Sequence, residues 1–124
     1  MSSTTACRRR ARRHRLSAES NARVDFSYPG PGDHACSMPV LDMSVAGFSF
    51  ELTEELPGLE VGYNIQDASF TIGTCSMEGE LVVMHVTDQE AGAVCGVLFY
   101  PATDTDLVKM RSLIAGIEAV ESSR

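Results

Sequence analysis

The sequence predicts a small, mainly β protein, an antiparallel barrel or sandwich that ends in one helix. Three observations predict this class. The chain has 124 residues, the size of one domain. Short segments of apolar and polar alternation are separated by turn residues, and only the C-terminal segment has apolar residues at helical spacing. No apolar run approaches the roughly 18 residues of a membrane span, which excludes a transmembrane protein.

Residues 1–20 are expected to form a flexible basic arm, and residues 21–124 the folded body. The first 23 positions hold seven arginines and one acid, a net charge of +6, whereas the remainder holds three basic and 16 acidic residues, a net charge of −13. The arm contains arginine and no lysine. Because the planar guanidinium can grip a phosphate or a guanine edge at two points, this composition favours recognition of an anionic ligand.

Seven segments of the body are typical of β-strands. The segment 91–100 is an almost continuous apolar run, which suits a strand that is buried on both faces. Prolines and glycines in 28–33 predict a turn, and 53–59 is expected to be a loop. The expected strands are 22–26, 38–43, 47–52, 60–65, 68–74, 80–87 and 91–100.

The C-terminal segment 103–122 is expected to be an amphipathic helix. Thr103 or Asp104 can cap its first turn, and acidic residues there suit the helix dipole. Gly116 costs about 1 kcal/mol relative to alanine without preventing the helix. The apolar residues that fall on one face are Leu107, Met110, Leu113, Ile114, Ile117 and Val120.

The cysteines and histidines point to neither an enzyme nor a metal protein. The four cysteines form no CxxC pair, and no secretory signal is visible, so we expect reduced thiols and a cytoplasmic protein. His34 and Cys36 could share a metal site, but no matching ligand pair accompanies them. His85 lies in an apolar run and is expected to be a strand residue. Without a nucleophile–base pair, metal cluster or phosphate-binding loop, we expect no catalysis and no cofactor.

Two short motifs point to a ligand. The run Arg8–Arg13 contains arginines four residues apart, and the segment Asp42–Gly47 reads DMSVAG, a DxSxxG pattern. Asp42 and Ser44 are two residues apart at a strand end, so their side chains are expected to share a face. Gly47 has no Cβ and permits a positive φ or a close approach of backbone to ligand. Taken singly, the arginines could be a solvated tail, and Asp42 and Ser44 could cap a turn.

The order RxxxR, strand, DxSxxG resembles the PilZ domain family, bacterial receptors for the second messenger cyclic di-GMP. The segment Gly96–Tyr100, followed by an acidic turn and a helix, is also similar to the family. The resemblance spans about residues 8–118, although 53–80 match only in pattern. It implies an all-β fold, a small antiparallel six-stranded split barrel with a C-terminal helix. The ligand-binding residues that it implies are Arg8, Arg9, Arg13, Asp42, Ser44 and Gly47.

The RxxxR register has two solutions, Arg9 with Arg13 or Arg8 with Arg12. We favour the first pair because it lies nearer the first strand. Arg8 then precedes the motif, and in the family an arginine there tends to accompany binding of a stacked ligand dimer. The stoichiometry stays open between one ligand molecule and that dimer.

The residues suit this ligand chemically. A guanine accepts a bidentate arginine at O6 and N7, and its N1–H and N2–H₂ groups can donate to the carboxylate of Asp42. The expected function is therefore that of a nucleotide-binding receptor or adaptor. Its arm changes conformation on binding and signals to an unidentified protein partner; the oligomeric state and the pathway stay open.

Three other interpretations remain from the residues. The basic arm could bind nucleic acid without specificity, although the acidic body argues against a broad footprint. The serine- and arginine-rich start could be an organelle-targeting segment that is removed in the mature protein. The chain could also be a PilZ-like interaction module that no longer binds a nucleotide.

Overall fold

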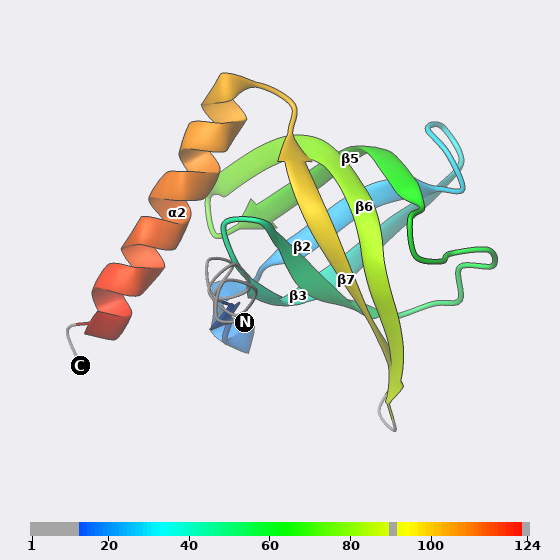
Figure 1. Ribbon diagram of the computed structural model, residues 1–124, viewed down its shortest axis with the longest axis horizontal. Coiled ribbons are helices and arrows are strands. Elements are labelled where there is room, and N and C mark those ends of the chain that lie inside the picture. Colours follow the sequence, from blue (N-terminus) through cyan, green and yellow to red (C-terminus); the bar gives the residue numbers. More distant parts are fainter. Residues whose placement is uncertain (1–12, 90–91, 123–124) are drawn as a thin grey trace, which may run out of the picture.

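The computed structural model describes residues 13–89 and 92–122, which form an antiparallel β-barrel with a C-terminal helix beside it (Figure 1). Seven strands, one short 3-10 helix and one α-helix make up these residues. In chain order the elements are β1 (His14–Arg15), η1 (Ala18–Ser20), β2 (Arg23–Tyr28), β3 (His34–Met43), β4 (Gly47–Leu52), β5 (Asn64–Ile72), β6 (Cys75–Gln89), β7 (Gly92–Pro101) and α2 (Asp104–Ser122).

Six of the strands close into a ring. Their order is β3-β2-β5-β6-β7-β4, and β4 pairs with β3, which closes the ring. Every neighbouring pair in the ring is antiparallel. The remaining strand, β1, is added to β3. The predicted mainly β class, the six-stranded antiparallel barrel and the terminal helix are thus confirmed. Among the described residues, no helix is long and apolar enough to cross a bilayer.

The barrel interior is built from alternating strand residues. In β2, Val24, Phe26 and Tyr28 are buried while Arg23 and Asp25 face outward, as the period of two requires. Aromatic rings fill the centre, where Phe48 stacks on Phe70 at a centroid distance of 5.0 Å. All five phenylalanines of the chain are buried: Phe26, Phe48, Phe50, Phe70 and Phe99.

One strand, β5 (Asn64–Ile72), stands where two strands, 60–65 and 68–74, were expected; residues 60–63 precede it in a turn, so most of the first expected strand is wrong. The pairing of β5 with β6 shifts register between Ile65 and Ala68, and Asp67 there has a φ of 56°. This bulge breaks the apolar alternation and makes one strand look like two. Before β5 the chain turns, because Gly62 takes a φ of 92°.

The other strands lie where the alternation predicts them, with different ends. β4 matches the prediction residue for residue, and β2 and β7 differ from it by one or two residues at their ends. β3 and β6 are longer than expected: they begin at His34 and Cys75, in segments whose polar residues face solvent.

Helix α2 spans Asp104–Ser122, close to the expected 103–122, and packs against β6 and β7. On α2, Met110 and Ile114 are buried against the barrel, whereas Val120 is exposed, so the packed face of the helix ends before its last turn. Of the two expected caps, Thr103 is the one used. Its Oγ1 accepts the backbone N–H of Asp106 at 3.2 Å and donates to the Asp106 carboxylate at 2.7 Å.

Candidate functional site

The last residues of the predicted arm lie on the barrel. In β1, His14 pairs with Met43 and Arg15 with Asp42, and the Leu16 N–H donates to the Leu41 carbonyl at 2.9 Å. Residues 14–16 therefore extend the sheet at β3, and η1 follows them, while the division of the chain at residue 20 remains a prediction. This pairing brings the side chain of Arg13 to the C-terminal end of β3.

Arg13 contacts both β3 and β4. Its Nη1 donates to Asp42 Oδ1 at 2.7 Å and to Ser49 Oγ at 2.8 Å. Asp42 and Ser49 are direct partners across β3 and β4, so their side chains leave the sheet on the same side. We call Arg13, Asp42 and Ser49 the arginine corner. Within it, Arg13 is half exposed, Asp42 is 23% exposed, and Ser49 is buried.

Ser49 was not among the residues that the sequence predicted. It is the polar residue of the alternating strand Gly47–Leu52, and nothing in that pattern separates it from an ordinary outward-facing serine. Its role becomes visible only through the β3–β4 register, which sets it beside Asp42.

Ser44 closes the turn between β3 and β4. Its Oγ accepts the backbone N–H groups of Ala46 at 3.1 Å and Gly47 at 3.3 Å, and its own N–H donates to the Gly47 carbonyl at 2.7 Å. Ser44 is buried. In this structure the Ser44 hydroxyl therefore caps the turn, which is the simpler of the two roles that the sequence allowed. A direct contact of Ser44 with a ligand remains a prediction.

Gly47 is required by the neighbouring strand. Its φ is not positive, but a Cβ at this position would lie 2.0 Å from the Val97 carbonyl oxygen of β7. Arg13, Ser44 and Gly47 line one small cavity of about 80 Å³ together with Met84 and Val97 of β6 and β7. The structure thus brings four of the predicted residues to one end of the barrel: Arg13, Asp42, Ser44 and Gly47.

The remaining two predicted residues, Arg8 and Arg9, lie outside the described residues, as does Arg12. The choice between the two RxxxR registers therefore stays a prediction.

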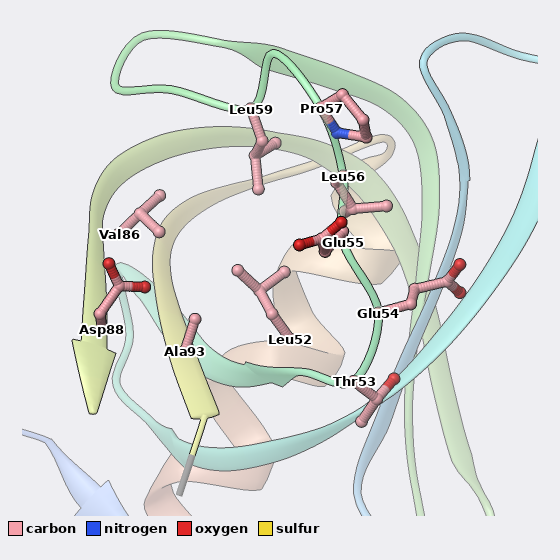
Figure 2. A pocket seen from close by; sticks show the side chains of 10 residues that line it. All are labelled: Leu52, Thr53, Glu54, Glu55, Leu56, Pro57, Leu59, Val86, Asp88 and Ala93. Atoms are coloured by element: carbon pink, nitrogen blue, oxygen red, sulfur yellow. The ribbon is translucent and has the colours of Figure 1, made fainter. Parts of the chain in front are cut away.

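A second cavity, of about 650 Å³, lies where the loop after β4 faces β6 and β7 (Figure 2). Its floor is apolar, with Leu52 and Leu56 among the lining side chains, and its acidic residues are Glu54, Glu55 and Asp88. None of the residues that line it is basic. A ligand with two phosphates would meet only negative charge here, so the arginine corner is the better candidate for an anion.

Cys95 is poorly suited to act as a nucleophile. This residue is fully buried in β7, and burial raises the pKa of its thiol to about 12, so no reactive thiolate forms at neutral pH. His85 lies in β6 as expected and is exposed, and its ring lies over Gly96, where an added Cβ would be 2.1 Å from Nε2.

Comparison with known proteins gives no match by sequence and clear matches by structure. No family model matches the chain. No curated protein matches it either. Three solved structures illustrate the structural matches, with 12–18% identity and 94% of this chain covered in each case.

The structure of a K. pneumonia MrkH–c-di-GMP complex has a TM-score of 0.79 and 18% identity, with 55% of that chain covered. YcgR from Escherichia coli in complex with c-di-GMP has a TM-score of 0.74 and 14% identity, with 48% of that chain covered. The chain thus spans about half the length of these two proteins. It covers 95% of the PilZ domain of YcgR from Escherichia coli with c-di-GMP, with a TM-score of 0.75 and 12% identity. The described residues therefore have the fold of a PilZ domain.

Proposed function

We propose that this protein is a cyclic di-GMP receptor in which the arginine corner is the barrel side of the binding site. The fold supports this, because solved structures with the same fold include a PilZ domain with c-di-GMP. The observation that carries the proposal is the contact of one guanidinium with both Asp42 and Ser49 at 2.7 and 2.8 Å. It holds a cation and a carboxylate side by side at the end of the barrel where the described part of the chain begins.

This pair complements guanine. The base offers acceptors at O6 and N7 and donors at N1–H and N2–H₂, so it needs a donor group and an acceptor group at adjacent positions. In the arginine corner only Nη1 of Arg13 is engaged with described residues, which leaves the rest of this half-exposed guanidinium for O6 and N7 or for stacking on the base. The second carboxylate oxygen of Asp42 can accept from N1–H and N2–H₂.

The rest of the site is proposed to come from the arm. Arg9 would supply a second guanidinium in the favoured register, and Arg8 would neutralise a phosphate or bind a second guanine, as in a stacked ligand dimer. Ser44 and Gly47 would keep the turn beneath the ligand in shape, since the serine hydroxyl and the glycine backbone already organise it.

A route from ligand to partner starts next to Arg13. His14 is buried, and its Nε2 lies 3.3 Å from the Glu118 carboxylate on α2. A ligand bound to the remaining N–H groups of Arg13 would pull on β1 and, through His14, bias the position of the helix. We propose that the protein acts in this way as a non-catalytic cytoplasmic adaptor, whose rearranged arm and helix are recognised by a protein partner.

The decisive experiment is calorimetric titration of the full chain with cyclic di-GMP. Arg13→Ala is expected to raise the Kd roughly 10- to 150-fold, because a hydrogen bond to a charged group is worth about 1.5–3 kcal/mol. Arg111→Ala is the matched control, since Arg111 is exposed on α2, and it should bind like the wild type. Unchanged affinity in Arg13→Ala would remove the arginine corner from the site.

Base specificity tests the role of Asp42. Adenine lacks the adjacent N1–H and N2–H₂ donors, so cyclic di-AMP should bind much more weakly than cyclic di-GMP. Asp42→Ala should narrow that difference by weakening cyclic di-GMP alone. Equal affinity of the wild type for both nucleotides would contradict guanine recognition by Asp42. Duplex DNA binding that falls steeply with salt would instead favour the nucleic-acid interpretation.

A further inference from the structure

Three potential metal ligands from two segments meet at the end of β3 that lies farthest from the arginine corner. They are His34 and Cys36 of β3 and Glu54 of the loop after β4. One ligand atom from each residue lies within 4.8 Å of the other two. The sequence offered only the first two, because Glu54 is 18 residues further along the chain than Cys36.

Strand geometry explains why the three side chains converge. His34 and Cys36 are two residues apart on one strand and therefore share a face. Val40 of β3 pairs with Phe50 of β4, and counting outward from that pair along both segments brings Glu54 level with Cys36. The His34 Nε2 and Glu54 Oε1 atoms are already 2.8 Å apart. In Figure 2 the Glu54 carboxylate points away from the apolar side chains of the cavity that it borders.

The three residues combine one fixed ligand with two adjustable ones. Cys36 is buried, whereas the side chains of His34 and Glu54 are 64% and 41% exposed. Bond lengths of 2.0–2.3 Å in a tetrahedral zinc site place its ligand atoms ~3.4 Å apart. Rotation of the two exposed side chains can bring the present spacing of up to 4.8 Å to that value while Cys36 stays in place.

The sulfur, nitrogen and oxygen atoms of these three side chains indicate which kind of metal ion they can bind. We propose that His34, Cys36 and Glu54 bind a zinc-type divalent transition metal ion, with the fourth position open to water or to a ligand from another molecule. A thiolate and an imidazole suit zinc, while magnesium and calcium prefer oxygen ligands alone. Thiolate and carboxylate together balance the two positive charges of the ion. The Cys36 thiol, whose sulfur lies 3.7 Å from the His34 carbonyl oxygen, would release its proton when the metal binds.

Cobalt(II) is a suitable probe for this site because a thiolate bound to it gives a charge-transfer absorption. The full chain is titrated with cobalt(II) in the presence of a non-thiol reductant. We expect the absorption to saturate at one cobalt per chain and to disappear when zinc(II) is added. A wild-type protein that shows no such absorption would overturn the proposal.

Variants locate the site. Cys36→Ser should abolish the absorption, and Glu54→Gln, at an exposed position, should weaken zinc affinity by at least the roughly tenfold that loss of a residue supporting a metal ligand costs. Cys75→Ser is the matched control, since this partly buried free cysteine is outside the cluster, and it should behave like the wild type. Full absorption in Cys36→Ser, or unchanged zinc affinity in a folded Glu54→Gln, would show that the cluster is not the site.

Discussion

Arg13 separates ligand binding from stability. An ion pair between exposed or half-exposed side chains contributes about 0–1 kcal/mol to folding, since water and salt screen it. The Arg13–Asp42 pair is of this kind, with Arg13 half exposed. Substitutions at Arg13 can therefore test the proposed nucleotide binding while the barrel stays folded. The same does not hold for Ser44 and Gly47, which the turn and the β4–β7 contact require.

Replacing glycine by alanine is expected to have opposite effects on stability at Gly47 and at Gly116. Gly47→Ala places a Cβ 2.0 Å from the Val97 carbonyl oxygen, and backbone cannot yield as a side chain does. We expect a loss of about 1–3 kcal/mol in the free energy of unfolding. Gly116→Ala meets no atom within 4 Å and should stabilise helix α2 by up to about 1 kcal/mol. Urea unfolding of both variants measures the two effects, and equal midpoints would refute this account.

At the residue scale, the sequence is most informative where the candidate site follows a short motif. Asp42, Ser44 and Gly47 lie within six residues, so a local pattern could identify them. Ser49 and Glu54 could not be identified in this way. Ser49 lies beside Asp42, and Glu54 beside His34 and Cys36, only because of the way β3 and the segment of β4 lie together, a long-range property that no local pattern encodes.

At the scale of the elements, the N-terminus of helix α2 is capped by side-chain hydrogen bonds. Thr103 accepts the Asp106 N–H, and the Asp106 carboxylate accepts from the Thr103 hydroxyl and from the Glu78 N–H of β6. The cap therefore also ties the helix to the barrel. Thr103→Ala should lower the free energy of unfolding by about 1 kcal/mol at neutral pH.

The same cap predicts a pH dependence. The hydrogen bonds from Thr103 and from the Glu78 backbone lower the pKa of Asp106 below its ordinary value. A carboxyl group whose pKa is lower in the folded state stabilises the protein above the unfolded-state pKa, about 3.9, and loses that contribution as the pH falls through the folded-state value. The stability difference between wild type and Asp106→Asn should therefore shrink between pH 5 and pH 2. Urea unfolding at several pH values would reveal a constant difference if this reasoning is wrong.

Elements were predictable where periodicity was unbroken. The alternation of Gly47–Leu52 and the helical spacing after Thr103 give β4 and α2 nearly residue for residue. The bulge of β5 at Asp67 interrupts the alternation, so the pattern predicts two strands where there is one. The two residues of β1, His14 and Arg15, carry no pattern, and only their pairing with β3 makes them a strand.

At the scale of the whole molecule, stability rests on the aromatic interior. Phe48 is 1% exposed and lies between Phe70 and Phe99, with centroid distances of 5.0 and 5.9 Å. Phe48→Ala should cost about 3–5 kcal/mol, a large part of the stability of a domain of this size. Val45→Ala, at a residue that is 49% exposed in the β3–β4 turn, should change stability by less than about 0.5 kcal/mol. Comparable losses in the two variants would show that the interior is not packed in this way.

The overall class was predictable because spacing and periodicity report it: many short alternating segments and one helical segment. Closure of the barrel was not derivable from the residues alone, since it depends on β4 pairing with both β3 and β7. The alternation satisfies a sandwich equally well, and the resemblance of two motifs to a known family was needed to choose the barrel.

Strand β1 has one more consequence, for anyone who shortens this chain. It takes over along β3 where β2 stops, because β2 pairs with residues up to Pro39 and β1 with Asp42 and Met43. A variant that begins at Ser17 would lack β1, which would leave the backbone groups of Asp42 and Met43 on that side of β3 without their partner. These groups could then pair with a strand of a second molecule. Self-association of a truncated variant could then be mistaken for a lost response to nucleotide, so point substitutions at the arginines are the safer design.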